Sequence, residues 1–178
     1  MPKLIGLTGG KGQGKDTAAK FGPCKSFAFA DPLKQAAMAM FDLTHEQVYD
    51  EALKDQVDVR YDKTPRQLLQ WLGTDVIRDQ FSKNHWLTLM EYKLIRAMEE
   101  GGPEDVITVT DCRFSNECDL IRSLGGRVVR IVREMEGAKA DAHASEKGVP
   151  DSCVDFTFKN DGTKEQLWER MRCLVVVM

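Results

Sequence analysis

The chain has 178 residues, of which 42% are hydrophobic and 30% charged, and its net charge is -3. This length and composition suit one α/β domain with a full hydrophobic core. The balance of charges disfavours bulk nucleic-acid binding, which needs a basic face. No apolar stretch is long enough to span a membrane, and the N-terminus shows no signal peptide. Five cysteines without a C-x-x-C pair favour reduced thiols and disfavour a zinc site.

Residues 3–17 carry the strongest pattern in the chain. The apolar run from Leu4 to Leu7 predicts a short buried strand, and four glycines follow between residues 9 and 14. Glycines let the backbone curl so that successive N–H groups point at one anion, and a helix after the loop directs its positive end to the same place. Lys15 then reaches the outer phosphates as a point charge. The segment predicts a phosphate-binding loop.

The loop departs from the common pattern at its end. Gly-x-x-x-x-Gly-Lys-Ser/Thr runs from Gly9 to Lys15, but Asp16 follows, and the hydroxyl arrives only at Thr17. A carboxylate beside a triphosphate repels it unless Mg²⁺ lies between them, so Asp16 is predicted near metal or substrate. The alternative is a glycine-rich turn with a surface lysine. The strand before the loop and the helix after it favour the phosphate loop.

Two helices and a strand are predicted directly after the loop. The first helix runs over 15–21, because the proline at 23 disfavours helical geometry in the residue before it. The alternating residues 25–30 predict a second strand. The next helix is predicted to begin with Asp31 as its N-cap and Pro32 as its first residue.

The middle of the chain is predicted to be helical and partly exposed. A short helix is expected at 44–53, followed by an exposed polar segment at 55–63. Thr64, which precedes a proline, is predicted to cap another helix with apolar residues at helical spacing from 68 to 77. Gly73 interrupts this helix. A glycine there costs about 1 kcal/mol relative to alanine, so close packing or a ligand is expected on that face.

Strands and helices alternate through the rest of the chain. Helices are predicted at 86–100, 116–124 and from 163 onward, strands at 106–110, 128–132 and 154–158, and a flexible loop at 134–151. This alternation predicts a parallel, doubly wound sheet whose functional site lies at the carboxyl ends of the strands.

Polar residues follow two of these strands. Asp111 and Arg113 come after the strand at 106–110, where an aspartate can hold a Mg²⁺-bound water and an arginine can fork onto a phosphate. The alternative is a helix N-cap aspartate with an exposed arginine. Arg133 opens the flexible loop, from which an arginine can close over a transferring phosphate. Arg130, within its strand, is equally compatible with a solvent-facing position.

The helix around Gly73 carries a polar stripe. Spacings of three to four place Arg66, Gln70 and Thr74 on one face, and Arg78 extends that face. Such a face could hold a second phosphate and a base edge. It could equally be the solvated side of an amphipathic helix, which the spacing alone favours.

Seven stretches, in order along nearly the whole chain, together form a family pattern. They are 12–17, 29–34, 66–75, 110–117, 125–133, 143–146 and 160–163. Together they resemble the deoxynucleoside monophosphate kinases of tailed bacteriophages, within the P-loop nucleoside-monophosphate-kinase group. The Lys15-Asp16-Thr17 variant of the loop is itself a feature of this family. Gln13 stands where the family usually has a small serine, which weakens the case for a side-chain phosphate contact there.

The resemblance implies ATP-dependent phosphorylation of a deoxynucleoside 5′-monophosphate, for dNTP supply, with Mg²⁺ bound. It implies donor binding by Lys11, Gly12, Gln13, Gly14, Lys15, Asp16, Thr17, Asn160 and Gly162. The implied acceptor-binding residues are Lys34, Arg66, Gln70, Thr74, Trp86, Arg113 and Glu146. The implied catalytic residues are Lys15, Asp16, Arg113, Arg130 and Arg133, and the implied metal-binding residues are Asp16, Thr17 and Asp111. Asp16 could instead orient the acceptor, and His143 receives no proton-transfer role.

The same resemblance implies a three-layer P-loop NTPase fold in a single domain, 1–178, with a five-stranded parallel sheet. A helical acceptor-binding insert is expected at about 43–100 and a mobile lid at about 134–151. The expected partners are small nucleotides in the cytoplasm, or in the host cytoplasm if the source is viral. Direct nucleic-acid or membrane binding is not expected, and the apolar C-terminus, 174–178, leaves a homodimer contact open. Two alternatives remain: a P-loop kinase for another acceptor such as dephospho-coenzyme A, and a nucleotide-dependent binding module.

Overall fold

The computed structural model describes residues 1–133 and 148–178. The predictions for His143 and Glu146 therefore lie outside the described residues. The chain divides into two compact units, which are described in turn. The first comprises Met1–Ala28 with Leu87–Met178, and the second is Phe29–Trp86. The single domain and the insert at about 43–100 stay predictions.

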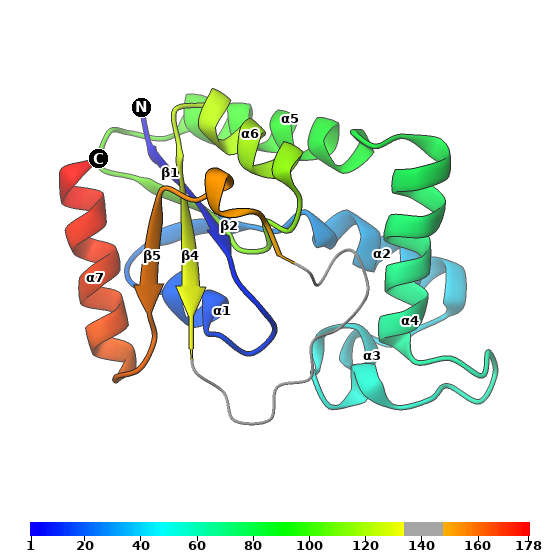
Figure 1. The fold of residues 1–178 in the computed structure, drawn as a ribbon. Helices are drawn as coiled ribbons and strands as arrows, with labels where there is room; N and C mark the ends of the chain where they lie inside the picture. The colour runs from blue at the N-terminus through cyan, green and yellow to red at the C-terminus, as the bar shows by residue number, and fades with distance from the viewer. Residues whose placement is uncertain (134–147) are drawn as a thin grey trace. The chain divides into compact units, whose positions relative to one another are not determined.

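The first unit is built on a five-stranded sheet (Figure 1). Its strands are β1 (Lys3–Thr8), β2 (Cys24–Phe27), β3 (Val106–Val109), β4 (Arg127–Val132) and β5 (Phe156–Lys159). They lie in the order β2-β3-β1-β4-β5, and every neighbouring pair is parallel. The predicted parallel sheet is confirmed, and β1 lies at its centre. Because the strands are parallel, their carboxyl ends share one edge, where the phosphate loop begins.

Helices cover both faces of this sheet, which gives three layers. On one face, α1 (Lys15–Ala18) and α7 (Lys164–Val177) pack on a cluster of apolar side chains from β1 and β4. On the other face lies α6 (Ser115–Ser123), whose Ile121 side chain occupies the space that a Cβ on Gly6 or Gly126 would need. The helix α5 (His85–Glu100) adds the buried Met90 and Leu94 to the core. Full burial of such side chains contributes about 1.5–3 kcal/mol each.

The second unit is helical. It contains α2 (Ala30–Phe41), α3 (His45–Tyr49), the 3₁₀-helix η1 (Leu53–Asp55), α4 (Pro65–Gln70) and the π-helix η2 (Trp71–Phe81). Its core is formed by Ala37, Phe41, Leu43, Val48, Leu68 and Leu72. Among the described residues of both units, none of the helices is long and apolar enough to cross a membrane.

The predicted starts of two of these helices are confirmed by side-chain caps. Thr44 and Thr64 each accept a hydrogen bond from the backbone N–H three residues later, and a glutamine at that position bonds back to the capping residue. The predicted helix at 44–53 is too long, because α3 ends at Tyr49. The Asp50 carboxylate then accepts hydrogen bonds from the N–H groups of Ala52 and Leu53, which starts a separate turn.

Two predictions near the N-terminus are wrong in detail. The first helix is a single turn, Lys15–Ala18, instead of 15–21. The second strand ends at Phe27, and α2 begins at Ala30 with Phe29 as its N-cap, so Asp31 is not the cap. Pro32 is the third residue of α2 and not, as predicted, the first; it is tolerated there because the first four N–H groups of a helix have no intrahelical partner.

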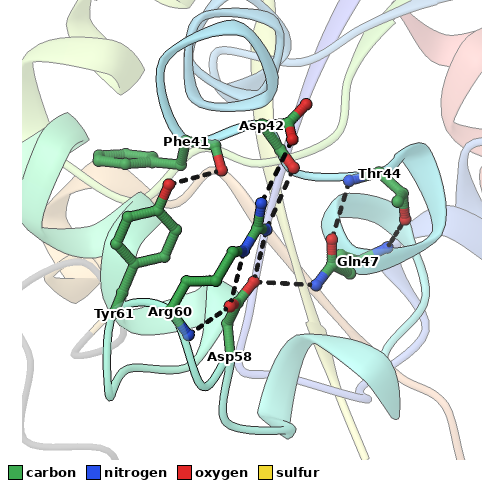
Figure 2. Close-up of polar contacts among 7 residues, drawn as sticks. All are labelled: Phe41, Asp42, Thr44, Gln47, Asp58, Arg60 and Tyr61. Carbon is green, nitrogen blue, oxygen red and sulfur yellow. Dashed lines mark hydrogen bonds and ion pairs between the residues drawn. The ribbon is translucent and has the colours of Figure 1, made fainter.

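A buried carboxylate lies in the segment predicted to be exposed at 55–63. Figure 2 shows Asp58 bonded to both Arg60 and Gln47. Arg60 Nη2 lies 2.7 Å from Asp58 Oδ2. Arg60 also reaches Asp42 at 3.3 Å, and the Tyr61 hydroxyl donates to the Phe41 carbonyl. Only 5% of the Asp58 side chain is exposed. This network closes the segment onto the end of α2 and the side of α3.

Candidate functional site: a phosphate loop and an arginine cluster

The phosphate loop has the backbone that its glycines predict. Gly9, Gly12 and Gly14 have φ angles of 139°, 74° and 99°, a region that favours glycine. The Lys15 side chain turns back over the loop, and its Nζ donates to the carbonyl oxygens of Gly9 and Gly10, each at 2.8 Å. These two bonds hold the ammonium group beside the loop backbone. Helix α1 follows directly, with Ala18 N–H bonded to the Gly14 carbonyl at 2.8 Å.

Two of these glycines also have no room for a side chain. A Cβ on Gly9 would lie 2.4 Å from the Ile131 carbonyl oxygen of β4. A Cβ on Gly14 would lie 2.3 Å from Nδ2 of Asn160. The loop is therefore pressed against β4 and against the turn that carries Asn160, and glycine is needed at both positions for space as well as for φ.

Gln13 is fixed within the loop at both its side chain and its backbone. Its Oε1 accepts a hydrogen bond from the Gly10 N–H at 2.7 Å, and its carbonyl oxygen accepts one from Asn160 Nδ2 at 2.9 Å. Asn160 is itself buried, with 9% of its surface exposed, and its N–H donates to the Val132 carbonyl at 2.7 Å. The loop is held from β4 and from the turn before α7, which also contains Gly162.

The end of the loop offers oxygen ligands. Asp16 is exposed and Thr17 is half-buried, and the Thr17 carbonyl accepts a hydrogen bond from the Trp168 indole at 2.7 Å. Hydroxyl and carboxylate oxygens, together with phosphate oxygens of a nucleotide, are the donor set that Mg²⁺ prefers. Within residues 1–133 and 148–178 there is no group of three His, Cys, Asp or Glu side chains that could hold a metal by themselves. The chemistry of Asp16 and Thr17 therefore fits Mg²⁺ bound jointly with a phosphorylated ligand.

Asp111 and Arg113 lie beside the central strand, at the sheet edge where the loop begins. The N–H of the intervening Cys112 donates to the Leu7 carbonyl of β1 at 3.0 Å. Asp111 is not a helix N-cap, because α6 begins at Ser115 and its N-cap is Phe114. The N-cap alternative for Asp111 is therefore excluded.

A buried glutamate orders the backbone at Arg113. Glu117 is 3% exposed, and its Oε2 accepts from the N–H groups of Arg113 and Phe114 at 2.8 and 3.1 Å. Sequence reasoning did not single out Glu117. Its position three residues after the N-cap, typical of a capping box, could have identified it.

Arg130 lies on β4, in register with Thr8 at the end of β1. Its guanidinium forms an ion pair with Asp151 through Nη1 and donates to the Val149 carbonyl through Nη2 at 2.7 Å. Arg130 is thus not a free surface side chain, since it ties residues 149–151 to the strand. Arg133, just after β4, is exposed.

In the second unit, Arg66 is held by two carboxylates. Its Nε donates to Asp55 at 2.7 Å and its Nη2 to Glu51 at 3.0 Å, and only 18% of the Arg66 side chain is exposed. Partial burial raises the pKa of Glu51, but hydrogen bonds and charge from Lys54 and Arg66 outweigh this and lower it to about 2. Burial likewise lowers the pKa of Arg66, but its hydrogen bonds to Asp55 and Glu51 raise it overall. Glu51 and Arg66 are therefore both ionised at neutral pH. Sequence reasoning missed both carboxylates, because they precede α4 and are too far from Arg66 in sequence for a spacing of three or four to signal the contact.

The remaining predicted acceptor residues are also in the second unit. Lys34 Nζ lies 3.7 Å from Asp31 and 4.4 Å from the centre of the Tyr49 ring. The Trp86 indole donates to the Gly73 carbonyl at 2.9 Å in a buried bond, and Gln70 is half-buried. These contacts fix Lys34 and Trp86.

The polar stripe predicted from Arg66 to Arg78, which runs over α4 and η2, is not solvated. Thr74 is 7% exposed and Arg78 is 8% exposed, so a solvated face is wrong for these positions. Gly73 is closely packed, as predicted: a Cβ there would lie 2.4 Å from Leu33 Cδ2.

A parallel sheet whose central strand runs into a lysine-bearing glycine loop defines the class of P-loop nucleotide-binding proteins. The dephospho-CoA kinase of Campylobacter jejuni has a similar fold, with a TM-score of 0.52 over 99% of this chain and 96% of that one, at 15% identity. Residues 57–171 match the model of the family described as deoxynucleotide monophosphate kinase. The chain belongs to this family.

Two viral relatives support this assignment. A protein of Acanthamoeba polyphaga mimivirus, provisionally named a deoxynucleotide monophosphate kinase, is 35% identical over 94% of this chain and 93% of its own length. The deoxynucleotide monophosphate kinase of Enterobacteria phage T4 is 31% identical over 64% of this chain. That alignment spans 46% of the phage protein. The resemblance to the phage enzymes expected from the sequence is confirmed.

Proposed function

We propose that this protein transfers the γ-phosphate of ATP to a deoxynucleoside 5′-monophosphate, giving the diphosphate and so supplying dNTP precursors in the cytoplasm. The observation that carries the proposal is the glycine loop, in which Lys15 Nζ is held at 2.8 Å from two loop carbonyls. Family membership names the acceptor class, since the matching family is described as deoxynucleotide monophosphate kinase.

The donor triphosphate binds the loop. Backbone N–H groups of residues 11–15 surround the phosphates, and Lys15 adds a positive charge that its carbonyl contacts keep in place. Asn160 and Gly162 border the adenine. Asp16, Thr17 and Asp111 would hold Mg²⁺ jointly with the nucleotide, and the ion would supply charge neutralisation to the phosphates.

The acceptor phosphate binds Arg66 and Arg113. Guanidinium groups bind phosphate through two parallel hydrogen bonds, which fixes the orientation of the anion as well as its position. Lys34, Gln70, Thr74 and Trp86 contact the rest of the acceptor nucleotide. This assignment is supported by the fixed positions of Thr74 and Trp86, which are both buried in the second unit.

Transfer itself needs position and positive charge. The acceptor phosphate is already ionised at neutral pH, so no general base is required. Arg130, on the strand that borders the loop, and Arg133, just after that strand, neutralise charge on the moving phosphoryl group. The ion pair between Arg130 and Asp151 must then open or shift for Arg130 to act directly.

The test is an acceptor screen that follows ADP release from ATP with each deoxynucleoside monophosphate in turn. We expect release to depend on at least one of them, and expect Arg113→Ala to abolish it without changing the melting temperature. Dephospho-coenzyme A enters the same screen as a competing acceptor. Turnover with that acceptor alone, or with none, contradicts the proposal.

A further inference from the structure

The phosphate loop is braced from outside by one buried amide side chain. Asn160 Nδ2 donates to the carbonyl oxygen of Gln13 at 2.9 Å, across 147 positions of sequence. The amide end that faces a carbonyl must be the donor, so the orientation of the Asn160 carboxamide is fixed by its partner. The backbone of Asn160 is held in turn by its bond to the Val132 carbonyl at 2.7 Å. The bracing group is therefore anchored to β4.

Holding the Gln13 carbonyl also sets the direction of an N–H group. In a trans peptide the C=O and N–H point in opposite directions, so the peptide between Gln13 and Gly14 directs the Gly14 N–H away from Asn160. In the part of the chain that the structure describes, this N–H donates to no other group. It immediately precedes Lys15, whose Nζ is fixed over the same loop. The Gly14 N–H is thus preset as a donor for an anion in the loop.

The brace also requires glycine at position 14. The φ angle of Gly14 is 99°, and a Cβ there would lie 2.3 Å from Asn160 Nδ2. The loop and Asn160 are therefore in direct contact, with no space for a water or another side chain between them. This contact is distinct from the brace inside the loop, where Gln13 Oε1 accepts from the Gly10 N–H at 2.7 Å.

We propose that Asn160 is a positioning residue for the donor phosphates, which acts through the Gln13–Gly14 peptide and not only on the adenine ring. The inference rests on the proposed function only in that the loop binds the polyphosphate of the donor. Asn160 lowers the cost of binding because the Gly14 N–H is oriented before the ligand arrives. Loss of the hydrogen bond from Asn160 should therefore weaken the binding of any polyphosphate, whether or not it carries a base.

The test compares inorganic tripolyphosphate and ATP as ligands of the full chain, by calorimetry. Asn160→Leu keeps the side-chain volume and removes the donor without adding charge, and Asn160→Ala removes both volume and donor. We expect each variant to bind tripolyphosphate and ATP about tenfold more weakly, which is the loss of about one hydrogen bond, and expect the loss to be as large for tripolyphosphate, which has no base, as for ATP. Asp161→Ala, at an exposed position in the same turn, is the matched control and should bind both ligands like the wild type.

Each other outcome overturns the inference. If folded Asn160→Leu binds tripolyphosphate within twofold of the wild type and only ATP binding weakens, Asn160 acts on the base. An NMR titration of the wild type guards against variants that do not fold: the Gly14 amide signal must shift when tripolyphosphate is added, and a signal that stays in place refutes the brace. Wild-type protein that binds no tripolyphosphate also refutes it. Wild-type protein that binds tripolyphosphate but phosphorylates no monophosphate refutes the proposed function alone.

Discussion

Lys15 and Arg66 show two different ways of holding a cation ready for a phosphate. Lys15 is held by two neutral backbone carbonyls, whereas Arg66 is held by two ionised carboxylates. A phosphate that approaches Lys15 meets no competing negative charge from these partners. A phosphate that approaches Arg66 must share the guanidinium with Asp55 and Glu51. The comparison teaches that backbone carbonyls can hold a cation in place without cancelling its charge, whereas the two carboxylates of the second unit cancel the charge of Arg66 until a ligand displaces or joins them.

The largest expected effect comes from Lys15→Ala. Removing a charge that stabilises the transferring phosphate should lower kcat/KM for ATP by about 10³-fold or more. The melting temperature should stay unchanged, because the Gly9 and Gly10 carbonyls regain water as a partner. Lys20→Ala, at an exposed position just beyond α1, is the control and should retain full activity. Equal losses in both variants would show that general positive charge matters and that the position of Lys15 does not.

Arg66→Lys should have the next largest effect. Lysine keeps the charge but cannot make two parallel hydrogen bonds, so kcat/KM for the acceptor should fall by about 10²-fold while the KM for ATP stays constant. Arg60→Lys is the matched control, since Arg60 also pairs with two carboxylates, Asp58 and Asp42. It should lower the melting temperature and leave acceptor kinetics unchanged. A loss of acceptor affinity in Arg60→Lys but not in Arg66→Lys would reverse the roles of the two arginines.

Asp58→Asn should reduce stability and leave kinetics intact. The hydrogen bonds from Arg60 hold the pKa of Asp58 well below its usual range, and the side chain is 5% exposed. Losing the charge leaves Arg60 without its main partner, so the melting temperature should fall by about 5 °C. Asp42→Asn removes the other carboxylate of Arg60, which is 98% exposed, and should change the melting temperature by about 1 °C or less. Equal shifts of the melting temperature in the two variants would mean that the burial of Asp58 contributes nothing to stability.

The smallest effect is the pH dependence of Glu51. Its pKa is lowered to about 2 in the folded chain, against about 4.3 in an unfolded one, so the stabilisation is fully present above the unfolded value and lost as the pH falls toward 2. The urea midpoint of Glu51→Gln should therefore lie below that of the wild type at pH 7, and the gap should narrow by pH 3. A gap that is the same at both pH values would show that Glu51 is not ionically coupled to Lys54 and Arg66.

Much of the fold could be predicted, because its signals are local. The parallel sheet follows from apolar runs alternating with helical patterns, and the cap predicted at Thr64 from the proline that follows it is confirmed. The pair Asp31-Pro32 gave the wrong start for α2, because a proline is tolerated anywhere in the first turn of a helix and so does not mark its first residue.

The site was less predictable where it depends on contacts between distant residues. The glycine loop is a local pattern, and its positive φ angles are where the pattern predicts them. The carboxylates that hold Arg66 lie 11 and 15 positions before it, far beyond the spacings of three and four at which side chains on one helix meet. The contact between Asn160 and Gln13 spans most of the chain. Asp58 reads as an exposed charge, because its burial depends on an arginine that folds over it.

The central claim is that a phosphate carried on the Lys15 loop is transferred to a second nucleotide. The most direct measurement follows ATP labelled in its γ-phosphate, with each deoxynucleoside monophosphate, and asks where the label goes. The account predicts label in a deoxynucleoside diphosphate for the wild type, and none for Lys15→Ala. Label released only as inorganic phosphate, at a rate that no monophosphate changes, would contradict it.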